Sequence, residues 1–296
     1  MKLVFFGTGG FGRYPLVCLS SHHEVALVIT SRGKTESTVA SLCNALGLPL
    51  LSTSNPNREE TIKIVRELSP DILVVTDYGY ILRDALISIP RLASLNLHPS
   101  LLPKYRGAAP IQRAIMNAER ETGVTTFFLS RDIDKGDIIL KQPTVIGINE
   151  TYGELKIRLS RIGGKLLLRS MALAQRNFKG VSQEGNTTYA PKIRKEERKI
   201  EWHGSSEKIK NLVHALSPKP GAYTSFRGKR LIILRGRAIP RSGKKPGEII
   251  DDEDLLVSTG DGSFQILKMR PEGSVTMSAY SFKLGYRPRV SEVMGA

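Results

Sequence analysis

The sequence predicts an α/β protein, with a doubly wound, mostly parallel, Rossmann-like sheet followed by a small β-barrel. Two observations lead to this fold class. Apolar strand segments alternate with amphipathic helical segments over about the first half of the chain, whereas short strands with frequent turns dominate from about residue 205. A chain of 296 residues is long enough for two cores. We therefore expect a catalytic domain over 1–190, a linker over 191–204 and a barrel over 205–296.

The charge of the chain is its most informative bulk property. A formal net charge of +16 favours a polyanionic partner, either nucleic acid or an anionic membrane surface, over a basic protein with neither. No apolar run approaches the length of a bilayer span, and the first residues lead directly into a strand, unlike a signal peptide. Cys18 and Cys43 are too few and too far apart for a disulfide framework or a metal site. We expect a cytoplasmic monomer with reduced cysteines, no metal and no membrane contact.

The first strand, Leu3 to Phe6, ends in a glycine-rich turn over 7–12. Its glycines fit the dinucleotide fingerprint, but that fingerprint also needs an acidic residue at the end of the second strand. The second strand, 25–30, runs instead into Ser31-Arg32-Gly33-Lys34. We therefore expect no NAD, and interpret the glycines as permitting a tight strand-to-helix turn.

Further alternation follows, with helices predicted over 38–46 and 57–68 and strands near 48–51 and over 71–76. The last of these strands leads into a Tyr-Gly turn over 77–82. On the residues alone, packed tyrosines around a permissive glycine are the simpler interpretation of that turn.

The segment from 92 to 110 organises the first domain. A strand over 92–97 breaks at Pro99, and strand alternation places Asn96 and His98 on one face at its end, where open α/β sheets bind ligands. A lone histidine is more often structural. This one shares a face with an amide and precedes a rigid basic loop, so both interpretations remain open.

The remaining elements of the first domain are a helix over 111–118, a strand over 123–129, an acidic turn over 132–137, an extended stretch over 138–146 and a helix over 151–175. The acidic turn lacks the later glutamate of a calcium loop, and a plain hairpin turn is an adequate interpretation of it. Gly163-Gly164 should weaken the last helix in its middle.

The second domain should hold a helix over 206–216, a Pro-Gly turn over 217–224 and several short strands. From Pro191 onward, 21 Lys and Arg face 12 Asp and Glu, and no acid occurs between Lys219 and Lys245. Strand alternation would put Arg235 and Arg237 on one face. Either a surface that follows a phosphate backbone or a solvated basic face fits this pattern.

Two continuous motifs carry a resemblance. His-Pro-Ser-Leu-Leu-Pro over 98–103 and Tyr-Arg-Gly-Ala-Ala-Pro-Ile-Gln over 105–112 resemble the signature of the folate-dependent formyltransferases, above all the members that act on methionyl-tRNA. The run over 194–202 is similar to the linker of that family. The resemblance implies transfer of a formyl group from 10-formyltetrahydrofolate to the α-amino group of initiator methionyl-tRNA in translation initiation. It also implies a C-terminal barrel of the oligonucleotide-binding type.

The resemblance also implies roles for single residues. The catalytic residues would be Asn96, His98 and Asp134. An amide and an imidazole can donate to an oxyanion, and a carboxylate can orient the imidazole or accept a proton, directly or through a water. Folate-binding residues would be Tyr78, Gly79, Tyr80, Ile81, Leu82, Ser100, Leu101, Leu102 and Pro103, with Ser100 bracing its loop. We expect tRNA contacts from Arg32, Lys34, Lys104, Arg106, Arg227, Lys229, Arg230, Arg235 and Arg237.

One departure from the family pattern is visible. The family carries a longer basic loop after its second strand, where this chain has only residues 31–34 before the next helix. Three other functions therefore remain as alternatives to the one that the resemblance implies. An N-formyltransferase for another amine, such as an amino-sugar nucleotide, would need the three catalytic residues but no basic barrel. A formyl-folate hydrolase would need no second domain, and an inert RNA-binding protein would need no catalytic residues.

Overall fold

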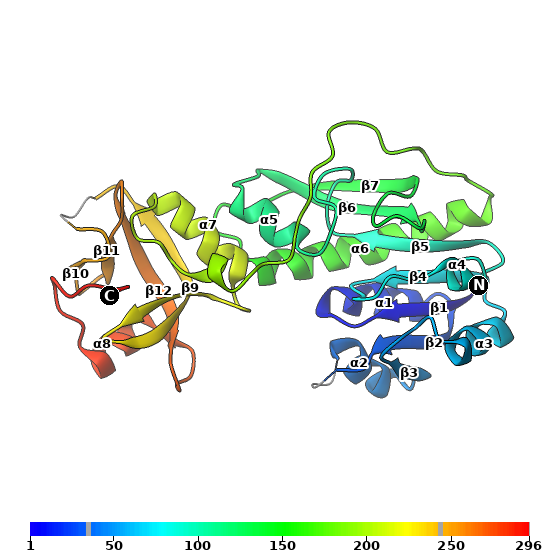
Figure 1. Cartoon of the computed structure of the whole chain (residues 1–296), viewed down its shortest axis with the longest axis horizontal. Helices are drawn as coiled ribbons and strands as arrows, with labels where there is room; N and C mark the ends of the chain where they lie inside the picture. Colours follow the sequence, from blue (N-terminus) through cyan, green and yellow to red (C-terminus); the bar gives the residue numbers. More distant parts are fainter. Residues whose placement is uncertain (34–36, 242–244, 296) are drawn as a thin grey trace. The chain divides into compact units, whose positions relative to one another are not determined.

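The protein is described by a computed structural model covering residues 1–33, 37–241 and 245–295 (Figure 1). The chain forms two compact units, each assembled from three separate segments of the sequence. Unit 1 consists of Met1–Pro110, Glu121–Val145 and Lys156–Ala190, and unit 2 consists of Ile111–Arg120, Ile146–Leu155 and Pro191–Ala296. No helix within the described residues is both long enough and apolar enough to cross a membrane.

Unit 1 is built on a seven-stranded sheet, which confirms the predicted doubly wound fold. Its strand order is β3 (Leu50–Thr53), β2 (Glu24–Ser31), β1 (Lys2–Gly7), β4 (Ile72–Thr76), β5 (Ala93–His98), β6 (Glu121–Phe128) and β7 (Ile138–Val145). The first five strands are parallel, and β6 and β7 are antiparallel to their neighbours. The chain order reverses between β1 and β4, so the carboxyl ends of these strands form a topological switch point.

The helices of unit 1 differ in how their ends are capped, and several of them start without a side-chain cap. They are α1 (Arg13–Ser20), α2 (Thr38–Leu46), α3 (Glu59–Leu68), α4 (Asp84–Ile87) and most of α6 (Tyr152–Gln175), with a 3-10 turn η1 over Gly10–Gly12. The Ser37 hydroxyl accepts a hydrogen bond from the Ala40 N–H at the start of α2, and Gly47 ends that helix at φ +65°.

The core of unit 1 lies between the central strands and these helices. Val4 and Phe6 of β1 and Leu73 of β4 are fully buried, and they pack with Ile62 and Val65 of α3. Burial of both faces explains why these strands are continuous apolar runs.

The glycine pair does not interrupt α6, contrary to the expectation of a weak point. A Cβ at Gly163 would lie 2.5 Å from Leu97 Cδ2, and one at Gly164 would lie 3.1 Å from Cys18 Cβ. The two glycines therefore permit close packing of α6 on β5 and α1.

Unit 2 contains an antiparallel sheet in the order β10 (Ile249–Asp251), β11 (Leu256–Ser258), β12 (Ser263–Pro271), β9 (Lys229–Ile239) and β8 (Ala222–Phe226), with β13 (Met277–Ser278) paired to β12. Helices α5 (Pro110–Met116), α7 (Ser206–Leu216) and α8 (Ala279–Tyr286) accompany it, with a 3-10 turn η2 over Glu196–Arg198. No pairing among the described residues joins β8 to β10, as in a partly open barrel. The core contains Trp202, whose indole N–H donates to Thr224 Oγ1 at 3.0 Å.

Candidate active site

The candidate site lies at the carboxyl ends of β1, β4 and β5. These three strands are parallel neighbours, so their last residues, Gly7, Thr76 and His98, lie along one edge of the sheet. The loops that follow them, 8–12, 77–83 and 99–109, include every segment in which the sequence predicted folate contacts.

His98 and Asp134 are brought together, as predicted. His98 Nδ1 lies 3.7 Å from Asp134 Oδ2, and the two side chains are 6% and 10% exposed. The other ring nitrogen, Nε2, lies 2.9 Å from the Tyr105 carbonyl oxygen. A carbonyl oxygen can only accept, so Nε2 must carry the proton and donate it. The nitrogen that faces Asp134 is therefore the open one, and it can donate only when the ring is protonated.

Asp134 is held by its own loop and by two other segments. It adopts a left-handed conformation at φ +55°, and its Oδ2 accepts a hydrogen bond from the Gly107 N–H at 2.8 Å. The Gln183 side-chain amide donates to the backbone oxygens of Asp134 at 2.9 Å and of Gly136 at 2.8 Å. Glycine at 107 matters because its φ is +116° and a Cβ there would approach the Ala190 carbonyl oxygen to 3.0 Å.

The segment 183–190 fastens the loop that follows β5. Arg106 donates from Nε and Nη2 to Gln183 Oε1, at 3.2 and 2.6 Å, and its backbone N–H donates to the Thr188 carbonyl oxygen. The Tyr105 N–H donates to Thr188 Oγ1, and Ala190 exchanges backbone hydrogen bonds with Arg106 and Ala109. The segment has no regular periodicity, so the sequence offers no signal for these contacts.

Asn96 lies two residues before His98 on β5, so alternation places both on the same face of the strand. It is partly exposed, and its amide forms no hydrogen bond to any described residue. A half-buried amide without an internal partner is available to a ligand.

The loop 99–105 is fixed from both sides. The Ser100 hydroxyl donates to the Lys104 carbonyl oxygen at 2.7 Å, and the Thr125 hydroxyl donates to the Ser100 carbonyl oxygen at 2.7 Å. The Leu102 N–H donates to the same Thr125 oxygen at 3.1 Å. Leu102 is fully buried with Phe127 and Ile138, so its side chain belongs to the core. Ser100 thus braces the loop, as expected.

The predicted folate turn, 77–82, combines buried and exposed side chains. Tyr80 and Ile81 are 37% and 59% exposed, whereas Leu82 is 5% exposed and packs in the core. The ring of Tyr78 packs edge-on against Phe6 at 5.4 Å, and burial, then the neighbouring Tyr80, raises the pKa of its hydroxyl. Within the described chain, neither the Tyr78 hydroxyl nor Thr76 Oγ1 has a hydrogen-bond partner.

The glycine loop after β1 is filled by the protein itself. Asp77 Oδ2 accepts from the Phe11 N–H at 3.0 Å, and the Asp77 carbonyl oxygen accepts from the N–H groups of Thr8 and Gly9. A Cβ at Gly9 would lie 1.9 Å from Asp77 Oδ2. In dinucleotide-binding loops a phosphate occupies such a position, and here a carboxylate takes it.

No group of three or more His, Cys, Asp or Glu side chains among the described residues is arranged to hold a metal ion. Cys43 is buried, which raises the pKa of its thiol to about 11, and Cys18 is partly buried. Both cysteines are free thiols.

Eight of the nine basic residues predicted to contact tRNA lie in the described part of the chain, and they fall into two groups. Three are engaged internally: Arg106 with Gln183, Arg227 with Glu292 and Arg235 with Glu154. The side chains of the other described members are exposed and form no ion pair with the described residues: Arg32, Lys104, Lys229, Arg230 and Arg237. Lys34 lies outside the described residues.

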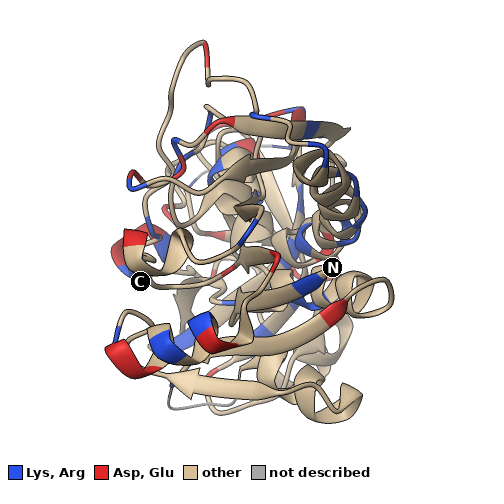
Figure 2. Cartoon of the chain, turned by 90° about the vertical axis from the view of Figure 1, so that its right-hand side faces the viewer, with Lys and Arg blue, Asp and Glu red and all other residues tan. Residues whose placement is uncertain are grey.

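Two basic features were missed from the sequence. Within unit 1, helix α6 carries Arg158, Arg161, Lys165 and Arg169 at helical spacing, with no acid between Leu155 and Gln183 (Figure 2). In unit 2, the guanidinium carbons of Arg230 and Arg198 lie 4.1 and 6.0 Å from the ring centre of Tyr223. Burial, then the nearby Arg230, lowers the pKa of Arg198.

Comparison with known proteins identifies the family. The family description "Formyl transferase" matches residues 1–171, and "Formyl transferase, C-terminal domain" matches 192–287. The methionyl-tRNA formyltransferase of Carboxydothermus hydrogenoformans is 42% identical over 305 residues, covering 99% of both chains. The chain belongs to the methionyl-tRNA formyltransferase family.

Solved structures of formyltransferase fold agree with this membership at low sequence identity. HypX from Aquifex aeolicus, in complex with tetrahydrofolic acid, matches 99% of this chain and 48% of its own, with a TM-score of 0.70 and 20% identity. The N-formyltransferase from Helicobacter canadensis, in complex with folinic acid and dTDP-3-aminofucose, matches 89% of this chain and 97% of its own, with a TM-score of 0.68 and 20% identity. At such identity these structures show the shared fold alone.

Proposed function

We propose that this protein transfers the formyl group of 10-formyltetrahydrofolate to the α-amino group of initiator methionyl-tRNA in translation initiation. The observation that carries the proposal is the full-length similarity to the methionyl-tRNA formyltransferase of Carboxydothermus hydrogenoformans, at 42% identity over 99% of both chains. We expect the protein to act as a monomer in the cytoplasm. Residues 1–190 would hold the chemistry, 191–204 would be the linker, and 205–296 would bind tRNA.

The geometry of the site suits this reaction. The folate cosubstrate supplies a formyl group already activated on nitrogen, so no protein nucleophile is required. The acceptor amine attacks the formyl carbon and must lose a proton. His98 Nδ1 is the open ring nitrogen and can take that proton, and Asp134, 3.7 Å away, stabilises the resulting imidazolium. The proton can then pass to the folate nitrogen as the bond between that nitrogen and the formyl carbon breaks.

The site also provides hydrogen-bond donors for the oxyanion that develops on the formyl group. The Asn96 amide is unengaged by the described residues and shares the strand face of His98. The Nδ1–H of the protonated His98 is a second donor on that face. Oxyanion donors are most effective when their positions are fixed in advance, and the contacts of segment 183–190 with Tyr105 and Arg106 fix the loop beside them.

The residues at the strand ends also fit a folate ligand. Thr76 Oγ1 and the Tyr78 hydroxyl are buried polar atoms without partners in the described chain, and buried polar atoms normally have partners. Beside them, Tyr80 and Ile81 expose apolar surface that a heteroaromatic ring system could cover. We propose that the turn 77–82 and the backbone of loop 100–103 border the folate ring system.

A single assay tests the proposal. The protein is incubated with 10-formyltetrahydrofolate and methionine-charged initiator tRNA, and the released amino acid is analysed for N-formylmethionine. We expect formylmethionine in proportion to enzyme and none without folate. The alternative acceptor is an amino-sugar nucleotide, such as the dTDP-3-aminofucose bound in the Helicobacter canadensis structure. Formylation of such a nucleotide, with charged tRNA left unmodified, would replace the proposal by that alternative.

A further inference from the structure

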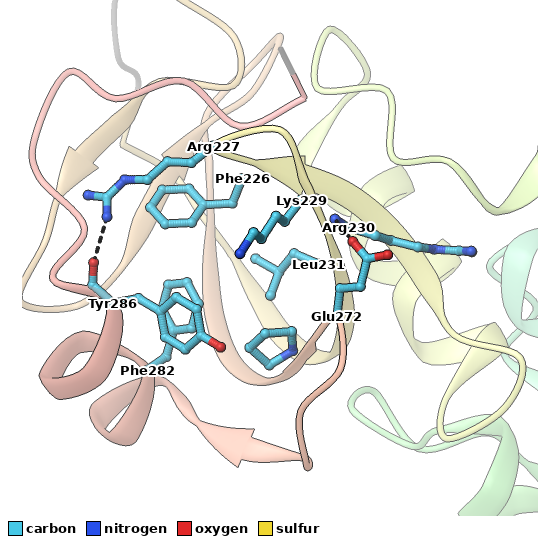
Figure 3. A pocket seen from close by; sticks show the side chains of 9 residues that line it. Phe226, Arg227, Lys229, Arg230, Leu231, Glu272, Phe282 and Tyr286 are labelled. Carbon is cyan, nitrogen blue, oxygen red and sulfur yellow. Dashed lines mark hydrogen bonds between the residues drawn. The ribbon is translucent and has the colours of Figure 1, made fainter.

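A small pocket lies in unit 2, and its lining includes none of the proposed catalytic residues. It has a volume of about 260 Å³ and lies where the β8–β9 turn, the end of β12 and helix α8 meet (Figure 3). Its lining includes Phe226, Lys229, Leu231, Glu272, Phe282 and Tyr286. The volume is below the usual range for whole cofactors and suits one planar ring.

One wall of this pocket is a stack of aromatic rings. Tyr286 lies parallel to Phe282, with ring centres 4.6 Å apart and planes 13° apart. Phe282 in turn meets Phe226 edge-on at 5.5 Å. Phe226 and Phe282 are buried, whereas Tyr286 is partly exposed, so Tyr286 is the ring that a ligand can reach.

Arg227 holds this wall in place. Its guanidinium donates to the carbonyl oxygens of Tyr286 and Arg287, at 2.9 and 3.1 Å, and to both carboxylate oxygens of Glu292. It also lies over the Phe226 ring at 4.7 Å. Arg227 is therefore committed to fixing the end of α8, and the aromatic wall exists before any ligand arrives.

The rim of the pocket offers one free donor and one free acceptor. The Lys229 side chain forms no hydrogen bond or ion pair with the described residues, and Figure 3 shows its ammonium directed into the pocket. Glu272 Oε2 accepts from the Arg230 N–H at 3.0 Å, while Oε1 has no partner among the described residues. The guanidinium of Arg230 lies over the Tyr223 ring and lacks a carboxylate partner in the described chain, so positive charge adjoins the site.

These features together describe a site for a nucleobase. Bases stack on exposed aromatic rings irrespective of sequence, and adjacent cations contact the phosphate backbone. A free carboxylate oxygen accepts from N–H and O–H groups, so it suits adenine, cytosine and guanine, which offer an exocyclic amine, better than uracil, whose base offers only a ring N–H. We propose that this pocket binds one unpaired base of the RNA substrate, stacked on Tyr286, with its amine on Glu272 and Lys229 on its carbonyl or phosphate oxygen. The inference rests on the proposed function for the identity of that RNA.

The test compares full-length variants for their affinity toward charged initiator tRNA over a salt series. Tyr286→Leu keeps the apolar contact with Phe282 but removes the stacking ring, so affinity should fall about tenfold while the salt slope stays unchanged. Tyr286→Phe keeps the ring and should stay within about twofold of wild type. The matched control is Tyr280→Leu, on the same helix but 68% exposed and outside the pocket, which should also match wild type. Equal affinity of Tyr286→Leu and wild type, or an equal loss in Tyr286→Phe, would overturn the proposal.

A second probe separates this inference from the proposed enzymatic function. Unstructured oligonucleotides of cytidine and of uridine are titrated directly, without folate or formylation. Wild type should prefer the cytidine strand, and Glu272→Gln should lose that preference. The glutamine oxygen can still accept from Arg230, but its amide then faces the base with a donor. No preference in wild type would overturn the amine contact. A preference in a protein that fails to formylate methionyl-tRNA would sink the proposed function and leave the pocket intact.

Discussion

One ring nitrogen of His98 is bonded to the backbone, because Nε2 donates a hydrogen bond to the Tyr105 carbonyl oxygen at 2.9 Å. The other nitrogen, Nδ1, faces the carboxylate of Asp134. This arrangement decides which nitrogen can do chemistry. The sequence indicated that either ring nitrogen was available. The loop after β5 removes one of them, because its carbonyl oxygen can only accept a hydrogen bond.

Substitution of the proposed catalytic residues should abolish turnover while the fold persists. Asn96→Ala, His98→Ala and Asp134→Asn should each lower kcat by about a hundredfold or more, which is typical for loss of an oxyanion donor or a general base. Formylmethionine production gives kcat, and thermal unfolding checks the fold. The matched control is Asp132→Asn, because Asp132 lies in the same turn, is exposed and, among the described residues, forms its ion pair with Lys135. Near-normal turnover of His98→Ala with every acceptor would refute the proposed mechanism.

The glycine loop should not bind a dinucleotide, since the Asp77 carboxylate already accepts the Phe11 N–H and would repel a pyrophosphate. Calorimetric titration with NAD and NADP should show no saturable binding, and saturable binding of either would contradict this expectation.

The same geometry predicts that Gly9→Ala lowers the free energy of unfolding by about 1–3 kcal/mol, because its Cβ would overlap the Asp77 carboxylate. Gly79→Ala is the control, with no atom within 4 Å of the added Cβ.

Arg237 is the better probe of tRNA docking than Arg235, although the sequence paired them. Arg235 donates to both oxygens of Glu154, at 2.6 and 2.7 Å, whereas Arg237 is exposed and forms no pair with the described residues. Arg237→Glu should weaken tRNA binding for different sequences alike and lower the salt slope by about one or more, because a phosphate contact is lost. Folate affinity should not change. An unchanged slope with unchanged affinity would identify Arg237 as a solvated surface residue.

Arg235→Glu should behave differently from Arg237→Glu. It breaks the pair with Glu154 and places two carboxylates together, so it should lower the melting temperature of the protein. The expected loss is at most about 1 kcal/mol from the pair itself, since both side chains are about half exposed.

Acid should remove the stabilising effect of one ion pair in unit 2. Glu197 accepts from Arg113 Nη1 at 2.6 Å and Nη2 at 3.1 Å, and these bonds, then the Arg194 N–H, lower its pKa to about 2. A carboxyl whose pKa is lower in the folded state stabilises the fold above its unfolded pKa, near 4.5, and this stability is lost as pH falls toward 2. Glu197→Gln should therefore reduce the free energy of unfolding by about 1–3 kcal/mol at pH 7 and by little at pH 2. Urea denaturation at both pH values measures the difference, and an equal loss at both would contradict the assignment.

Much of the fold follows from local pattern. Continuous apolar runs such as 72–76 predict buried parallel strands, and their alternation with helices predicts the doubly wound sheet. The face shared by Asn96 and His98 also follows from strand alternation alone. Errors at element ends are small in unit 1, for example β5 at Ala93–His98 against the predicted 92–97, because terminal residues depend on contacts outside the element. In unit 2 they are larger, since β8 (Ala222–Phe226) begins within the predicted turn over 217–224.

Contacts between residues far apart in the sequence could not be predicted from local pattern. Asp134 was placed beside His98 only through resemblance to a family, since 36 residues separate the two and no periodicity links them. Gln183 and Thr188 went unnoticed because irregular segments carry no repeating pattern, although they fasten the loop over the site. For the basic residues, the sequence shows which side chains are charged but not which of them form ion pairs within the protein.

The sequence by itself determined most strands and helices of unit 1, the face of β5 that bears Asn96 and His98, and the excess of positive charge, because each depends on the order of residues within one segment. The tertiary structure alone decided that Asp77 fills the glycine loop, that Tyr105 leaves only one nitrogen of His98 open, and that Arg235 is paired while Arg237 is not. Each of these outcomes depends on groups far apart in the chain meeting within hydrogen-bond distance, and only the folded chain brings them together.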